Sequence, residues 1–271
     1  MLYKLLFSAA LANGLGLGLG FVTHLSLASF LDVENYGLFS FVFSIAVMVS
    51  LFANLGFNAS VQRFIPAIGA DDSQRDINSL LVFAQSVVML ASLVVSAVVF
   101  ILLYYFKPIN TEPEFSVYGA GFVLAFILSV NRLQVGILKA FHQGFLAICF
   151  ESVFREVLFL LIIWGGFLFG VMLLSASVNL WGYICVLISL VCIAQYVIAK
   201  KYTLSFDARF TRVEVIKWLR ISMPIMMLAA AQMLMHRIDI MMLGFMVPME
   251  DVGAYGFAAK ISQGATIVFM A

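Results

Sequence analysis

The chain has 271 residues, of which 64% are hydrophobic and 11% are charged. Soluble domains contain roughly 45–50% apolar and about 25% charged residues, so this composition excludes a soluble globular protein. The net charge of +1 at pH 7 lacks the basic excess of a nucleic-acid-binding protein. The composition therefore predicts a polytopic integral membrane protein.

Taken in chain order, eight segments are apolar over about the 20 residues that a helix needs to cross a bilayer. The first segment is longer than the ~7–15-residue apolar core of a cleaved signal peptide, so we interpret it as an uncleaved span. The expected fold is an all-α transmembrane helix bundle. Its predicted spans are residues 7–31, 37–61, 79–105, 117–139, 144–170, 180–199, 221–246 and 253–271.

The first predicted span carries glycine at every second position from Gly14 to Gly20. Leu19 breaks the G-x-G-x-x-G spacing of a dinucleotide-binding loop. The spacing instead pairs Gly14 with Gly18 and Gly16 with Gly20, and small residues four apart predict close packing against another helix. A first helix that bends during transport is the alternative interpretation.

The basic residues of the connections are unevenly distributed. With the N-terminus placed inside, ten of them fall on the inner side and one, Lys107, falls on the outer side. Cytoplasmic loops carry such an excess of Lys and Arg, which predicts a cytoplasmic N-terminus. The inner residues are Lys4, Arg63, Arg75, Lys139, Lys200, Lys201, Arg209, Arg212, Lys217 and Arg220.

No connection is long enough to hold a soluble catalytic or nucleotide-binding domain, and no GxxxxGK[ST] motif occurs. The histidines and cysteines have no metal-ligand spacing, and the cysteines fall inside apolar runs. We therefore expect no enzyme activity, no metal site and no cofactor. The residues concerned are His24, His142, His236, Cys149, Cys185 and Cys192.

The segment before the seventh span begins with the capping-box pair Thr211 and Glu214. Apolar and basic residues then alternate at helical spacing up to Arg220, which predicts a short amphipathic helix on the inner membrane surface. A plain cytoplasmic loop is the alternative. Either way, residues 204–220 are expected to form a linker.

Residues 31–45 and 247–261 resemble each other when one is shifted by 216 positions. Each stretch is a predicted outer loop followed by the start of an inward-running helix, so the two copies have the same orientation, as in transporters built from parallel repeats. The repeat predicts a first lobe of six spans in residues 1–203 and the start of a second lobe in 221–271, so the chain is expected to be a fragment. The identities are Glu34/Glu250, Gly37/Gly253, Phe41/Phe257 and Ile45/Ile261.

Charged residues fall inside several predicted spans. A charge at the bilayer centre costs at least ~2.5–3.5 kcal/mol, so it usually lines a cavity or has a partner. Arg132 and Glu151 are expected at a similar depth in the inner half, and Arg155 near the midplane. Glu151 and Arg155 are spaced for a helical ion pair. Glu156 is expected to point about 100° away from Arg155, the helical angle between adjacent residues.

A second group of charges is expected towards the outer side. Asp239 and Lys260 are each seven residues from the outer end of consecutive spans, so equal depth makes them a candidate pair. His24 is expected at that depth, and Arg237 lies off the face that carries His236 and Asp239. The alternative for all of these charges is structural: satisfied ion pairs, or cations that reach the headgroups.

Three stretches, residues 28–31, 34–40 and 54–66, resemble the polysaccharide transporter family, the O-antigen flippase-type branch of the multidrug/oligosaccharidyl-lipid/polysaccharide exporter superfamily. Residues 238–244 and 252–261 resemble the opening of that family's second lobe. The resemblance implies a bacterial inner-membrane protein with two six-helix lobes around a central cavity. It also implies that basic residues meet the substrate, here Arg132, Arg155, Arg237 and Lys260.

The resemblance implies movement of a polyprenyl-pyrophosphate-linked oligosaccharide across the inner membrane by alternating access. The expected partners are this lipid-linked substrate, membrane lipids, and polysaccharide polymerase and glycosyltransferases, with no nucleic acid. One alternative is a cation-coupled small-molecule exporter that uses Glu151 and Asp239 as ion sites. Another is a non-transporting scaffold for polysaccharide assembly enzymes.

Overall fold

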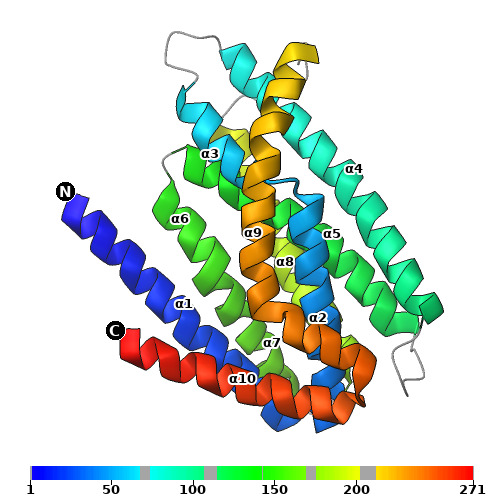
Figure 1. The fold of residues 1–271 in the computed structure, drawn as a ribbon. Helices are drawn as coiled ribbons and strands as arrows, with labels where there is room; N and C mark the ends of the chain where they lie inside the picture. The colour runs from blue at the N-terminus through cyan, green and yellow to red at the C-terminus, as the bar shows by residue number, and fades with distance from the viewer. Residues whose placement is uncertain are drawn as a thin grey trace.

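The computed structural model describes residues 2–67, 74–106, 115–141, 143–168, 175–201 and 212–270. These residues form an all-α bundle (Figure 1). Its elements are α1 (Leu2–Phe30), α2 (Val33–Ala53), α3 (Phe57–Ala67), α4 (Gln74–Phe106), α5 (Phe115–Ala140), α6 (Gly144–Ile148), the π-helical turn η1 (Cys149–Phe154), α7 (Arg155–Leu168), α8 (Ala176–Lys201), α9 (Arg212–Met246) and α10 (Met249–Met270).

Six helical stretches of the described residues are long and apolar enough to cross a membrane, which confirms the polytopic all-α prediction. They are Ala10–Phe30, Val33–Ala67, Ile77–Tyr105, Phe115–Ala140, Ala176–Lys200 and Glu214–Met246. The predicted fifth span corresponds to α6, η1 and α7 in series, and the predicted eighth span falls in α10.

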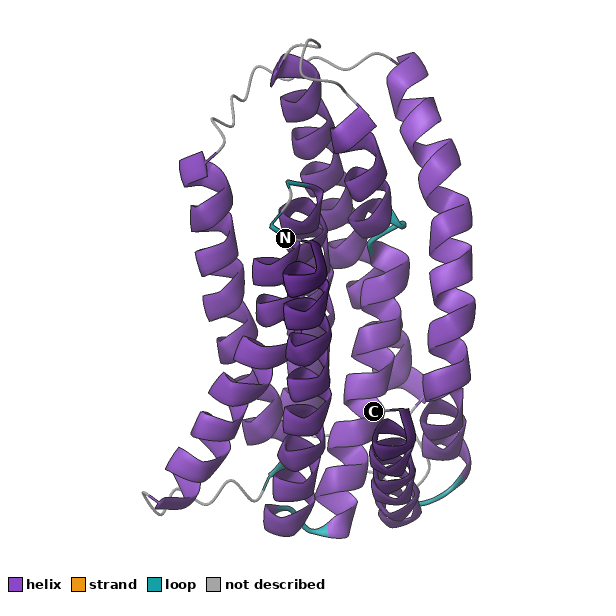
Figure 2. Cartoon of the chain, turned by 90° about the vertical axis from the view of Figure 1, so that its left-hand side faces the viewer, coloured by secondary structure: helices purple, strands orange, loops and turns teal. Residues whose placement is uncertain are grey.

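The two ends of the bundle differ in the elements that meet there. The helices α1 and α9 end, and α2 and α10 begin, at the bottom of Figure 1, which we call the Gly37 end. The helix α3 and the starts of α4 and α9 lie at the opposite, Arg63 end. Figure 2 shows most helices running vertically and α10 almost end-on, so α10 runs across the bundle at the Gly37 end.

The second predicted span is not one continuous helix. The backbone turns at Leu55 and Gly56, which have φ values of 50° and 77°, and α3 starts at Phe57. A Cβ atom at Gly56 would lie 2.3 Å from the Ser222 carbonyl oxygen, so this turn requires glycine. The Asn54 side chain stabilises the break, because its Oδ1 accepts a bond from the Asn58 N–H at 2.9 Å.

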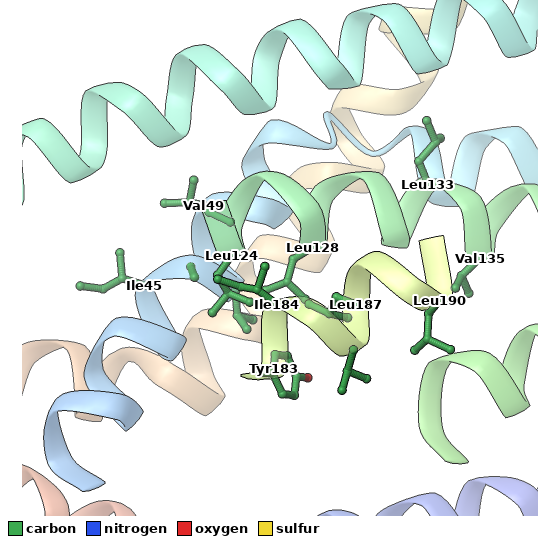
Figure 3. Close-up of a cluster of buried hydrophobic side chains, with 14 of the residues drawn as sticks. Ile45, Val49, Leu124, Leu128, Leu133, Val135, Tyr183, Ile184, Leu187 and Leu190 are labelled. Carbon is green, nitrogen blue, oxygen red and sulfur yellow. The ribbon is translucent and has the colours of Figure 1, made fainter. Parts of the chain in front are cut away.

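The core of the bundle is built around α5 and α2. Both helices are buried over most of their length, whereas α4, α8 and α9 each leave a broad apolar face exposed. Figure 3 shows the apolar contact of these two helices with α8. Because α2 is apolar all round, it is suited to the interior of the bundle. The labelled side chains include Ile45, Val49, Leu124, Leu128, Ile184 and Leu187.

The predicted interfacial helix before the seventh span is not a separate element. The helix α9 starts at Arg212 and continues without interruption to Met246. Its first turns pack against the bundle, because the Trp218 ring lies 5.3 Å from the Phe83 ring and the Ser222 hydroxyl is bonded to that of Ser60 at 2.7 Å. Thr211 of the predicted capping box lies outside the described residues.

Candidate functional site

Four basic side chains from different helices face one region of the bundle interior. Arg132 comes from α5, Arg155 from α7, Arg237 from α9 and Lys260 from α10, and we call them the cationic cluster. Each interacts electrostatically with at least two of the others. The fold therefore places near one another all four basic residues that were predicted from the sequence to meet the substrate.

One buried carboxylate accompanies the cationic cluster. Glu156 is 7% exposed, and its Oε1 accepts hydrogen bonds from Arg155 Nε at 3.0 Å and Arg155 Nη2 at 2.7 Å. Glu156 also acts electrostatically on Lys260. The prediction that Glu156 points away from Arg155 is wrong, because the long arginine side chain folds towards its neighbour at the junction of η1 and α7.

The predicted ion pair between Glu151 and Arg155 is not formed. Glu151 instead pairs with Lys139 of α5 at 2.5 Å, and the Glu151 side chain is 48% exposed. This pair links the end of α5 to η1. An exposed ion pair contributes at most about 1 kcal/mol to the free energy of unfolding. Glu151 therefore forms a weak contact near the surface. Glu151 still lies within electrostatic range of Arg132 and Arg155.

Arg132 lies where the second span is broken. It lines a small cavity together with Asn54, Asn58 and Met226 of α9. Among the described residues, Arg132 forms no hydrogen bond and no ion pair. Its guanidinium therefore keeps the planar set of N–H donors that suits phosphate and carboxylate oxygens.

Arg237 connects α9 to α2 without a carboxylate partner in the described part of the chain. Its Nη1 donates a long bond of 3.4 Å to the Ser44 hydroxyl, and its guanidinium lies 5.4 Å from the centre of the Phe43 ring. These are weak contacts for a charged group in an apolar setting. Arg237 therefore adds to the positive charge of the cluster.

The predicted pair of Asp239 and Lys260 is also wrong. Asp239 Oδ2 accepts a bond of 2.9 Å from the Tyr255 hydroxyl, and Lys260 Nζ donates one of 3.3 Å to Gln263 Oε1. The reason is that α10 runs across the bundle instead of alongside α9, so equal distance from the helix ends does not give equal depth. Asp239 stays on the exposed face of α9, next to His236.

Aromatic hydroxyls complete the site, and sequence reasoning did not find them. The buried Tyr183 of α8 lies near Arg132, Arg155 and Arg237. Tyr36 of α2 lies 3.4 Å from His24 Nδ1 of α1 through its hydroxyl. Nothing in the sequence distinguishes these tyrosines from ordinary core aromatics, because their role depends on helices far apart in the chain.

The arrangement is suited to an anion. Arg155 and Lys260 interact with the buried carboxylate of Glu156, whereas Arg132 and Arg237 add two further positive charges. The fold provides no group of three or more His, Cys, Asp or Glu side chains for a metal ion in the described part of the chain. Hydrogen bonds between ionised partners are roughly twice as strong as neutral ones, and arginine meets phosphate with two parallel bonds. A phosphate or sugar-acid group would therefore be stabilised between these helices.

The chain matches a known protein family over nearly its whole length. A scan against protein-family models matches the model described as polysaccharide biosynthesis protein over residues 2–271. A search of curated proteins and a search of solved structures each returned no match. The family match and the six apolar helices together describe a multi-pass membrane protein.

Proposed function

Because this chain belongs to the polysaccharide biosynthesis protein family, we propose that it moves a polyprenyl-pyrophosphate-linked oligosaccharide across the bacterial inner membrane. The observation that carries the proposal is the cationic cluster, accompanied among the described residues by one buried carboxylate, Glu156. Each uncompensated charge costs at least ~2.5–3.5 kcal/mol at the bilayer centre. A pyrophosphate entering this region would neutralise several of these charges at once.

The residues have distinct roles in this proposal. Arg132 has no hydrogen-bond partner among the described residues, so its donors are free to bind the pyrophosphate. Arg155 is held by Glu156 and is positioned for the same group. Arg237 and Lys260 extend the positive region towards the Gly37 end, where sugar acids would be stabilised. The whole site favours a lipid-linked anion over a neutral solute.

The distribution of surface charge supports an orientation. Basic side chains gather at the Arg63 end, and acidic side chains gather at the Gly37 end. Because basic residues are enriched on the cytoplasmic side, the Arg63 end is assigned to the cytoplasm. The residues are Arg63, Lys139, Lys200, Lys217 and Arg220 at one end, and Asp32, Glu34, Glu250 and Asp251 at the other.

The alternative of a cation-coupled exporter rests on Glu151 and Asp239 as ion sites. Glu151 is paired with Lys139 at the surface, and Asp239 is bonded to Tyr255 on an exposed helix face. Neither carboxylate forms a hydrogen bond or ion pair with a member of the cationic cluster within the described residues. The geometry therefore favours the lipid-linked oligosaccharide.

The test uses the native gene in the source bacterium. Arg132→Ala and Arg155→Ala are each expected to leave the lipid-linked oligosaccharide in the inner leaflet and to reduce surface polysaccharide at least ~10-fold, because a charge-assisted hydrogen bond contributes about 1.5–3 kcal/mol. Arg63→Ala, which removes an exposed arginine outside the cluster, is the matched control. Normal surface polysaccharide in both cluster variants, at normal protein levels, would contradict the proposed function.

A further inference from the structure

The break between α2 and α3 (Figure 1) lies against the face of α5 that carries Arg132. Ser129, Arg132 and Gly136 share this face, because residues three and four apart are neighbours on a helix. The Asn54 side chain donates to the Ser129 carbonyl oxygen at 2.9 Å. A Cβ atom on Gly136 would lie 2.2 Å from the Asn58 carbonyl oxygen, so the backbone of α3 touches α5 here. Arg132 is therefore held beside the start of α3.

Unused hydrogen-bond donors line the small cavity beside Arg132. The Arg132 guanidinium, the Asn58 side-chain amide and the Gly56 N–H form no hydrogen bond with the described residues. None of the lining residues is acidic, and the remaining ones are Leu51, Asn54, Met226 and Ala229. The amide of Asn54 is already bonded on both sides, to the Ser129 carbonyl and the Asn58 N–H. Three donors that lack an acceptor therefore border one cavity.

The start of α3 adds to the positive potential of this cavity. The helix has 11 residues and begins inside the membrane-crossing stretch Val33–Ala67, where Leu55 and Gly56 turn the chain. The N-terminus of a helix has the effect of roughly half a positive charge. Broken helices of membrane proteins direct such ends at anionic groups. Gly56 and Asn58 flank the start of α3 and both line the cavity, so this helix end lies at the cavity.

Arg132 has no counter-charge of its own in the described part of the chain. Its charged neighbours are Arg155 and Arg237, which repel it, and Glu151. Glu151 is already paired with Lys139, and its side chain is 48% exposed. A charge that is buried without a partner lowers the stability of the fold. An anion in the cavity would remove this cost.

The size of the cavity selects the kind of anion. Its volume is about 30 Å³, which is roughly the volume that one water molecule occupies in the liquid. A chloride ion is of similar size, whereas a phosphate group with its shell of oxygens is larger. A water molecule would fit as well, but it would leave the charge of Arg132 uncompensated. The cavity therefore suits a monatomic anion.

We propose that the cavity at the break between α2 and α3 binds a single chloride ion, held by Arg132, Asn58 and the Gly56 N–H. The ion neutralises Arg132 while no substrate is bound. Binding of chloride requires no transported substrate, so it goes beyond the proposed function. Only the replacement of the ion by the pyrophosphate at Arg132 rests on that function.

The experiment measures the thermal stability of the full-length protein, purified in a non-ionic detergent. Chloride is exchanged for gluconate at constant ionic strength, because gluconate is too large for the cavity. Chloride is expected to raise the Tm by at least about 3 °C, the shift for a ligand present at roughly ten times its Kd. Arg132→Gln is expected to lose this dependence on chloride. Arg63→Gln, which changes an exposed arginine of α3, is the control and is expected to keep it.

A second variant supplies the negative charge from the protein itself. Asn58→Asp places a carboxylate beside Arg132 and at the start of α3, where it takes the place of the ion. In gluconate this variant is expected to be at least as stable as the wild-type protein in chloride, and chloride is expected to have no further effect. It keeps the test decisive if Arg132→Gln fails to fold.

Chloride NMR detects the bound ion directly. The wild-type protein is expected to broaden the chloride resonance, because a bound ion tumbles slowly with the micelle, whereas Asn58→Asp is expected to leave it narrow. Equal stability of the wild-type protein in chloride and gluconate would overturn the chloride site. A dependence on chloride that survives in Asn58→Asp would do the same.

The outcomes separate the chloride site from the proposed function. If chloride acts as expected but Arg132→Ala and Arg155→Ala export normally, the chloride site stands and the assigned substrate is wrong. If the arginine variants fail to export and chloride has no effect on the purified protein, the proposed function stands and the chloride site is wrong.

Discussion

At the scale of single residues, Glu156 partly compensates the positive charge inside the bundle. It is the buried carboxylate that accepts two bonds from Arg155, whereas Glu151 is paired with Lys139 near the surface. A partner lost from a buried pair leaves an uncompensated charge, and this costs more than an exposed pair contributes. The two carboxylates, five residues apart, therefore differ in their effect on stability.

This difference is testable with two matched substitutions. Glu156→Gln is expected to lower the free energy of unfolding by about 1–3 kcal/mol, because the bonds to Arg155 lose their charge. Glu151→Gln is expected to lower it by less than about 1 kcal/mol, since its side chain is 48% exposed. Reversible unfolding of the purified protein in mixed detergent micelles measures both. Equal losses in the two variants would show that burial does not distinguish them.

A second residue-scale prediction concerns the break after α2. Gly56→Ala is expected to destabilise the fold by more than about 2 kcal/mol, because the backbone is left-handed there and a Cβ atom would meet Ser222 at 2.3 Å. Gly119→Ala in α5 is the control, since no atom lies within 4 Å of its Cβ position. Reversible unfolding in mixed micelles again measures both. A control as damaging as Gly56→Ala would show that the close approach of Ser222 is not the cause.

At the scale of elements, the glycines of α1 divide into two faces. A Cβ atom on Gly16 would lie 2.4 Å from the Ser152 Cβ of η1, and one on Gly20 would lie 3.8 Å from the Glu156 carboxyl carbon. Gly14 and Gly18 have no such neighbour within 4 Å among the described residues. One of the two predicted small-residue pairs therefore packs against η1 and α7, and the other does not meet a described helix.

The element-scale prediction follows from these two faces. Gly16→Leu is expected to separate α1 from η1 and to impair both stability and export, because small residues allow this close approach. Gly18→Leu, with the same change in size on the open face, is expected to be tolerated. Protein level and thermal stability in detergent distinguish the two. Tolerance of Gly16→Leu would show that α1 is not held at η1.

At the scale of the whole molecule, α9 presents polar side chains where an apolar surface is expected. Gln232, His236 and Asp239 lie on one face and are exposed. The 216-residue shift superposes them on Gly16, Gly20 and Thr23 of α1, of which Gly16 and Gly20 pack against η1 and α7. Polar groups that face lipid cost free energy, so we expect further helices to pack against this face.

We therefore predict that the native protein has a second lobe, comparable in size to residues 1–203, that covers this face. Reading the native gene beyond the codon for Ala271 tests it directly. Further transmembrane segments in frame would support the duplication. A stop codon at this point would require a separate partner chain to cover α9, and co-purification of the membrane complex would then identify it.

The all-α membrane fold was predictable from composition and hydropathy. A helix needs about 20 apolar residues to cross a bilayer, and apolar stretches of this length can be recognised directly in the sequence. The positions of Arg132, Arg155, Arg237 and Lys260 were also visible, because charges are rare and costly in such segments. These properties are local, so they need no knowledge of which helices become neighbours.

The pairing of those charges was not predictable in the same way. Spacing within one helix suggested Glu151 with Arg155, and equal depth suggested Asp239 with Lys260. The real partners depend on how the helices pack. The break at Leu55, the orientation of α10 and the recruitment of Tyr183 to the site likewise arise from contacts between distant segments. Hydropathy places a residue within the membrane, whereas the packing angle of its helix selects the groups it meets.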